Sequence, residues 1–75
     1  MRRNKRYRYL INDNPMGLEV HDLDNEKTGP SECQIDEIRN YRWLVGTTET
    51  DLVFWLNENR EYDGCAYCLL HLHWK

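Results

Sequence analysis

The amino-acid sequence predicts a small α+β domain, in which an N-terminal β-hairpin and one further strand pack with two short helices. Three observations indicate this fold class. Apolar residues alternate on both sides of a turn-forming segment, two helix-capping patterns follow, and three cysteines offer a way to stabilise a chain too short for a large core. Because 40% of the residues are apolar and 31% are charged, we expect residues 1–75 to form one globular domain.

The predicted hairpin lies near the start of the chain. Residues 6–11 alternate so that Tyr9 and Ile11 share one face, and residues 18–22 alternate again. Residues 12–17, between them, combine asparagine, aspartate, proline and glycine, which favour tight turns. This pattern predicts two antiparallel strands joined by a short loop.

A first helix and a third strand are predicted in the middle of the chain. Ser31 and Gln34 have the spacing of a capping box, which predicts a helix that begins after Ser31. Ile35 and Ile38 would form its buried stripe. Residues 43–45, which are tryptophan, leucine and valine, favour a short buried strand.

The second predicted helix begins with another capping box, formed by Thr48 and Asp51. The apolar run that follows, residues 52–56, would also suit a buried strand, but the length of the segment and its cap favour a helix. Residues 63–64 indicate a turn. Residues 65–74 are then expected to form a compact knuckle that can end in a helical turn.

Basic residues are concentrated at the N-terminus, where five of the ten lie in the first eight positions. The rest of the chain carries thirteen acidic and five basic side chains. The basic arm, residues 1–6, could contact the phosphates of a nucleic acid, or it could fold back on the acidic body of its own domain. We favour the second interpretation, because the acidic body would repel a polyanion beyond the reach of the arm.

Neither a membrane partner nor secretion is expected. No stretch of the sequence approaches the roughly 20 apolar residues that a membrane-spanning helix requires. The charged start of the chain has no apolar segment behind it and therefore differs from a secretory signal. These features predict a cytoplasmic protein.

The cysteines form the candidate site. Cys65 and Cys68 have the Cys-x-x-Cys spacing that allows two thiolates to bind one tetrahedral zinc ion. Cys33 would supply a third thiolate, because it is expected at the N-terminus of the first helix, where the helix dipole lowers the pKa of a thiol. The predicted cofactor is therefore Zn²⁺.

A histidine can complete the ligand set. His21 ends the second predicted strand, which could lie beside the start of the helix that carries Cys33. His71 and His73 lie in the C-terminal tail, residues 69–75, shortly after the Cys-x-x-Cys pair. We favour His21 as the fourth ligand, with His71 or His73 as alternatives. With four protein ligands the site would be closed to water, and the zinc would be structural.

Other roles for the cysteines compete with zinc binding. A free cysteine often behaves as a small buried apolar residue, and a Cys-x-x-Cys pair can be a redox dithiol. The ligand-like spacing disfavours the first role, and the short chain after the pair disfavours the second, because such dithiols usually open a long helix. An iron–sulfur cluster on the same ligands is a further alternative.

Three segments, residues 20–23, 33–38 and 62–68, together resemble a family of small, mostly uncharacterised bacterial zinc-binding proteins. That family has a strand ending in histidine, a helix with one cysteine, a helix led by threonine or serine, and a Cys-x-x-Cys knuckle. More distantly, the pattern is similar to the amino-terminal metal-binding domain of the bacterial Ada DNA-methylation repair protein. The resemblance implies four zinc ligands: His21, Cys33, Cys65 and Cys68.

The sequence thus predicts a structural-zinc module that is not an enzyme and that interacts with a protein, or with a nucleic acid through its basic arm. No serine triad, phosphate-cradling loop or paired carboxylate motif indicates a catalytic site. The alternative function is a zinc-thiolate transfer protein, similar to a DNA-repair protein, in which one ligand cysteine is the nucleophile. That alternative requires a ligand cysteine that is exposed to its substrate.

Overall fold

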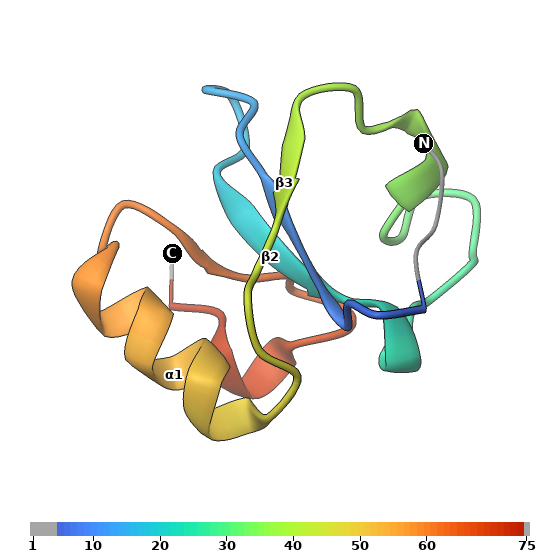
Figure 1. The fold of residues 1–75 in the computed structure, drawn as a ribbon. Helices are drawn as coiled ribbons and strands as arrows, with labels where there is room; N and C mark the ends of the chain where they lie inside the picture. Colours follow the sequence, from blue (N-terminus) through green and yellow to red (C-terminus); the bar gives the residue numbers. More distant parts are fainter. Residues whose placement is uncertain (1–4, 75) are drawn as a thin grey trace.

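The computed structural model describes residues 5–74, which form a four-stranded mixed sheet and one α-helix and so confirm the α+β class (Figure 1). The sheet has the order β3-β1-β2-β4 and consists of β1 (Tyr9–Asn12), β2 (Glu19–Asp22), β3 (Tyr41–Trp43) and β4 (Asp63–Gly64). The helices are α1 (Glu49–Glu58) and the 3-10 turns η1 (Leu23–Asn25), η2 (Ile35–Glu37) and η3 (Leu70–Leu72). Within the described residues, no helix is both long and apolar enough to cross a membrane.

The predicted hairpin is confirmed. Strands β1 and β2 pair antiparallel, with Leu10 opposite His21. Between them, the backbone N–H of Gly17 donates to the carbonyl oxygen of Asn14 at 2.8 Å, which closes the turn that the sequence indicated. Strand β1 starts at Tyr9, three residues later than predicted, and residues 5–6 form a turn.

The other two strands differ from the prediction. Strand β3 lies two residues earlier than residues 43–45, and Val45 is 90% exposed. The predicted turn at residues 63–64 is instead strand β4, which pairs parallel to β2 with Gly64 opposite Val20. A side chain at Gly64 would come within 2.8 Å of the carbonyl oxygen of Leu69, so glycine is required by close packing at this position.

The first predicted helix is wrong. Gln34 has a left-handed backbone with φ of 51°, and its side-chain amide donates to the carbonyl oxygen of Pro30 at 2.6 Å. Polar side chains that bond locally in this way compete with helix formation, and a left-handed residue interrupts it. Only the 3-10 turn Ile35–Glu37 forms here, so Cys33 lies in a loop and not at a helix N-terminus.

The second predicted helix is confirmed, which excludes the strand alternative for residues 52–56. Thr48 and Asp51 form the full capping box: the Asp51 N–H donates to Thr48 Oγ1 at 3.1 Å, and the Thr48 N–H donates to Asp51 Oδ2 at 3.2 Å. Leu52 and Leu56 are the buried residues of α1. The helical turn expected in the knuckle is also present, as η3.

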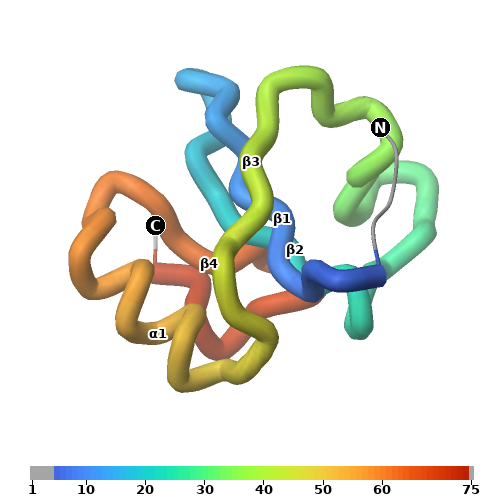
Figure 2. Tube along the Cα trace, in the orientation of Figure 1, coloured from blue at the N-terminus to red at the C-terminus, as the bar shows by residue number. Residues whose placement is uncertain are grey.

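The two faces of the sheet are covered differently. Because side chains alternate along a strand, one face carries Ile11, Val20 and Arg42. The opposite face carries Leu10, His21 and Trp43. The Arg42 guanidinium lies 5.9 Å from the ring of Trp55 in α1, so we call the first face the helix face. Figures 1 and 2 show α1 on one side of the sheet and the segment from η1 to η2 on the other side, which we call the cluster face.

Candidate metal centre

Four buried side chains meet at the cluster face: His21, Cys33, Cys65 and Cys68. Their ligand atoms all lie within 4.8 Å of one another, and none of these residues is more than 7% exposed. His21 comes from the centre of β2, Cys33 from the loop before η2, and the two remaining cysteines from the knuckle after β4. The four residues that the sequence favoured as ligands are thus brought together, and they could hold a metal ion.

The sulfur atoms are close but not bonded. Cys33 Sγ lies 3.7 Å from Cys65 Sγ, and Cys68 Sγ lies 3.8 Å from Nδ1 of His21. A disulfide requires a separation of about 2.05 Å, so all three cysteines are free thiols in this arrangement. The cluster is therefore not a disulfide with an odd cysteine.

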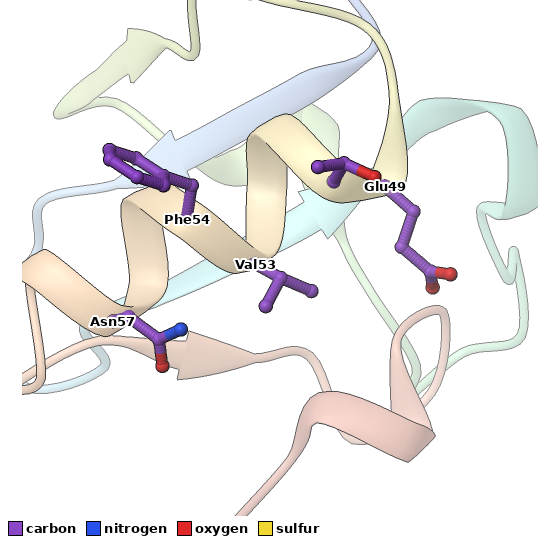
Figure 3. A pocket seen from close by; sticks show the side chains of 5 residues that line it. Glu49, Val53, Phe54 and Asn57 are labelled. Atoms are coloured by element: carbon purple, nitrogen blue, oxygen red, sulfur yellow. The ribbon is translucent and has the colours of Figure 1, made fainter.

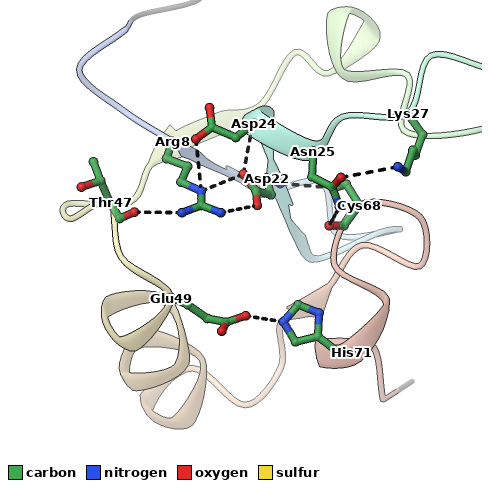
Figure 4. Close-up of polar contacts among 9 residues, drawn as sticks. All are labelled: Arg8, Asp22, Asp24, Asn25, Lys27, Thr47, Glu49, Cys68 and His71. Atoms are coloured by element: carbon green, nitrogen blue, oxygen red, sulfur yellow. Dashed lines mark hydrogen bonds and ion pairs between the residues drawn. The ribbon is translucent and has the colours of Figure 1, made fainter.

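The two alternative histidines lie elsewhere. His71 contacts Glu49 of α1 through its Nε2 atom (Figure 4). Nδ1 of His73 lies 2.8 Å from Oδ2 of Asp63 and 3.0 Å from the carbonyl oxygen of Gly64. Both histidines thus attach the C-terminal tail to the body, and His21 is the histidine of the cluster.

Strand β4 positions the knuckle beside His21. Because Gly64 is opposite Val20, Cys65 continues the strand next to His21, and its N–H donates to the carbonyl oxygen of Val20 at 2.9 Å. The chain then turns back, with the Leu69 N–H donating to the carbonyl oxygen of Cys65 at 3.0 Å. The parallel pairing of only two residues therefore determines where the Cys-x-x-Cys pair lies.

Each sulfur accepts a backbone N–H group. Cys68 Sγ accepts from Asp22 at 3.2 Å. Cys33 Sγ accepts from Lys27 at 3.4 Å, and Cys65 Sγ accepts from Tyr67 at 3.4 Å. Such donors stabilise negative charge on sulfur and so favour thiolate ligands. Sequence reasoning missed these donors, because a backbone amide has no residue type by which it could be recognised.

A partly buried ion pair supports the segment that supplies one of these donors. The Asp22 carboxylate, whose side chain is 5% exposed, accepts two hydrogen bonds from Arg8, both 3.0 Å long (Figure 4). The side-chain amide of Asn25 in η1 donates to the carbonyl oxygen of Cys68 at 2.9 Å. Arg8 therefore contacts the acidic body of its own domain; residues 1–4 of the predicted basic arm lie outside the described residues.

The charges within the cluster are strongly coupled. Hydrogen bonding with Cys68, together with His21, outweighs burial and lowers the pKa of Cys65 to about 3. The Cys65 thiolate and burial in turn raise the pKa of Cys68. Burial opposes the imidazolium form of His21, but the nearby Cys65 sulfur and Glu19 carboxylate favour it and raise the pKa of His21 to about 10. The protein alone thus stabilises one thiolate beside an imidazolium, whereas a divalent cation would stabilise several thiolates at once.

The second ring nitrogen of His21 is unusual. Nε2 is buried and has no hydrogen bond. Glu19 Oε1 lies 3.2 Å away, which is within ion-pair distance but outside hydrogen-bond geometry. In metal sites, a ligand histidine commonly directs its second nitrogen to a carboxylate, which fixes the orientation of the ring. The donor set and this histidine–carboxylate pair both fit a bound cation.

A separate hollow lies on the outer side of α1 (Figure 3). It has a volume of about 320 Å³ and is lined by Glu49, Thr50, Val53, Phe54 and Asn57. The Phe54 side chain is 66% exposed beside it. This hollow brings together neither a nucleophile nor a group of metal ligands, and we regard it as a surface feature.

Comparison with known proteins does not assign this chain to a family. No family model, curated protein or solved structure matches it. The similarity to small bacterial zinc-binding proteins and to the Ada domain therefore stays a prediction from the sequence. The function is inferred from the geometry of the cluster.

Proposed function

We propose that this protein is a small, non-enzymatic zinc-binding module in which one structural Zn²⁺ ion is held by His21, Cys33, Cys65 and Cys68. The observation that carries this proposal is the convergence of three thiols and one imidazole, all buried, from segments far apart in the sequence. Structural zinc sites commonly have this Cys₃His composition and a closed tetrahedral geometry.

The distances support zinc. Tetrahedral zinc, with Zn–S bonds of about 2.3 Å and Zn–N bonds of about 2.0 Å, separates its sulfur ligands by about 3.8 Å and a sulfur–nitrogen pair by about 3.5 Å. The sulfur–sulfur separation of 3.7 Å between Cys33 and Cys65 and the sulfur–nitrogen separation of 3.8 Å between Cys68 and His21 are close to these values. All four atoms lie within 4.8 Å of one another, so the most widely separated pair would have to approach by about 1 Å for all four to bind one zinc ion.

Burial favours a structural role over transfer chemistry. A zinc-activated thiolate that accepts a group from a substrate must be reached by that substrate. Cys65 is 2% exposed, Cys68 is 1% exposed and Cys33 is 7% exposed. The alternative of a DNA-repair-like transfer protein therefore lacks the exposed ligand cysteine that it requires.

We propose a protein partner for this module in preference to a nucleic acid. Arg8 is paired with Asp22, and Arg42 is paired with Asp13, so both cations are balanced by carboxylates of the same chain. The exposed apolar residues of α1, Val53 and Phe54, are suited to a protein contact. The acidic side chains around them are Glu49, Asp51 and Glu58. These carboxylates would repel a nucleic acid and attract a basic protein segment.

The proposal is tested first by elemental analysis and absorption spectroscopy of protein purified without a metal-affinity tag. We expect one zinc per chain and no visible absorption. Iron with visible absorption would indicate an iron–sulfur cluster instead. Protein that folds with no metal at all would contradict the proposal.

Histidine variants test the ligand set with matched controls. We expect His21→Gln to lose stoichiometric zinc, because it removes the nitrogen ligand. His71→Gln and His73→Gln should retain one zinc per chain, since their partners are Glu49 and Asp63. Loss of zinc in either control variant, with retention in His21→Gln, would show that the fourth ligand comes from the tail.

A further inference from the structure

The cluster faces a cleft on one side. His21 and Cys33 both line this cleft, which has a volume of about 410 Å³ and lies between the hairpin and the segment around η2. Its wall carries three carboxylates, those of Glu19, Glu32 and Glu37, against one arginine, Arg39. The cleft is thus acidic and leads directly to two of the four cluster residues.

His21, which lines this acidic cleft, carries a buried nitrogen without a hydrogen bond. The His21 side chain is 1% exposed, and its Nε2 atom has no hydrogen bond, although Glu19 in the cleft wall lies 3.2 Å away. A buried polar atom without a partner is rare in folded proteins. Because His21 lines the cleft, its unpartnered nitrogen adds a polar group to the acidic wall beside the cluster.

The four ligand residues differ in how firmly they are held. Cys65 and Cys68 lie in a knuckle that hydrogen bonds to β2, and His21 is part of β2 itself. Cys33 lies in a loop held by local hydrogen bonds, such as that from the Lys27 N–H to its own sulfur. It is also the most exposed of the four. Cys33 is therefore the ligand that can move at the lowest cost.

We propose that this acidic cleft is the route by which metal cations enter and leave the centre, with Cys33 as the first ligand to exchange. The proposal rests on the proposed function, because it requires a metal at the cluster. The negative wall raises the local concentration of cations and lowers that of anions. No oxidation state changes during exchange: the Cys33 thiolate donates its electron pair to the incoming cation as its bond to the outgoing ion breaks.

The test uses the zinc-loaded protein and two probes of opposite charge, the Cd²⁺ ion and the anionic chelator EDTA. The variants are Glu32→Gln, Glu37→Gln and their double substitution, and the control for the loss of one charge is Glu58→Gln on α1, outside the lining of the cleft. Protein-bound zinc is followed over time at low ionic strength. We expect the double variant to exchange zinc for Cd²⁺ at least about threefold more slowly, and to lose zinc to EDTA faster by a similar factor.

Opposite changes in the two rates are specific to an electrostatic route. Both changes should shrink at high salt, because screening then weakens the field of the cleft. If the substitutions only loosened the fold, zinc would be replaced by Cd²⁺ faster and lost to EDTA faster. This result would contradict the proposed route. Unchanged rates would overturn it as well. The zinc content measured beforehand separates these results from a failure of the proposed function, in which the wild-type protein would hold no zinc at the start.

Discussion

The two faces of the sheet are covered by opposite means. On the helix face, a regular α-helix buries Leu52 and Leu56, each with at most 1% of its surface exposed. On the cluster face, residues 23–40 and the knuckle contain only short 3-10 turns within the described chain. Contacts there run from backbone amides to sulfur atoms and from side chains to backbone oxygens. The helix face is thus covered by a regular helix with apolar packing, whereas the cluster face combines buried apolar residues, such as Leu10 and Ile35, with polar contacts around the cluster.

The difference between the two faces follows from how each covering segment satisfies the hydrogen bonds of its backbone. A helix pairs its own N–H and C=O groups and can cover a sheet with apolar side chains alone. An irregular segment cannot pair these groups internally, so it needs other partners and a cross-link to compensate for its conformational entropy. In a chain of 75 residues, the zinc ion that we propose would supply that cross-link in place of a second helix.

The largest effect is expected on the cluster face, from Cys68→Ser. Serine preserves most of the packing volume but removes a thiolate ligand. Structural zinc contributes about 10–16 kcal/mol in small zinc peptides, whereas the core of so short a chain contributes only about 3–5 kcal/mol. We expect the variant to be unfolded at room temperature by circular dichroism, as the wild-type protein should be after chelation. Equal thermal unfolding of the two proteins, with and without chelator, would contradict a zinc-dependent cluster face.

A smaller effect is expected on the helix face, from Leu56→Ala. Leu56 is 1% exposed, and a buried leucine truncated to alanine typically costs about 2–5 kcal/mol. The native fraction of the variant should still hold one zinc per chain, because the cluster lies on the other face of the sheet. Urea denaturation at saturating zinc measures the loss. Zinc content below one in the folded fraction would show that the two faces are not independent.

The helix face was also the more predictable of the two. Its helix α1 follows from the capping box of Thr48 with Asp51, and the hairpin, which both faces share, follows from the alternation around Tyr9 and Ile11. In these segments the local preference and the tertiary contacts agree. The capping pattern at Ser31 failed because Gln34 uses its amide to bond Pro30 within the same loop.

On the cluster face, the sequence predicted the ligand residues better than their surroundings. The cysteine spacing and a histidine near a strand end favoured the residues that meet, with His71 and His73 left as alternatives to His21. Strand β4 was missed because a two-residue parallel strand has no pattern of its own, and Asp63 with Gly64 has the composition of a turn. The ion pair of Arg8 with Asp22 joins positions fourteen residues apart, which no local pattern encodes.

An intermediate effect is expected from Asp13→Asn, at a polar contact on the helix face. The Asp13 carboxylate accepts hydrogen bonds from Arg42 Nε at 2.6 Å and from the Tyr62 hydroxyl at 2.5 Å, which links β3 to the segment that enters the knuckle. We expect a loss of about 1–2 kcal/mol, reduced by the exposure of Arg42. Denaturation of both proteins with urea measures this difference.

The difference in unfolding free energy between the wild type and Asp13→Asn has a predictable pH dependence, which tests the role of the carboxylate charge. The bond with Arg42, followed by that with Tyr62, holds the pKa of Asp13 below its usual value despite burial. A carboxylate with a lowered folded pKa stabilises the protein fully above its unfolded pKa of about 3.9, and this stabilisation is lost as the pH falls through the folded value. The wild-type advantage should therefore be equal at about pH 5.5 and about pH 7.5. A smaller advantage at the lower pH would contradict the assignment to an ionised Asp13.

The smallest effect is expected at the start of α1, from Thr48→Ala. The substitution removes the oxygen that accepts the Asp51 N–H at 3.1 Å, and loss of an N-cap typically costs about 1 kcal/mol. Thr48→Ser should retain most of the stability that Thr48→Ala loses, because serine provides the same hydroxyl acceptor. Since the cap lies far along the chain from the cluster residues and only stabilises the helix face, the zinc content and the rate of zinc loss to EDTA should match the wild type. A faster rate of zinc loss in Thr48→Ala, reversed in Thr48→Ser, would show that the helix also holds the metal centre together and that the two faces act as one unit.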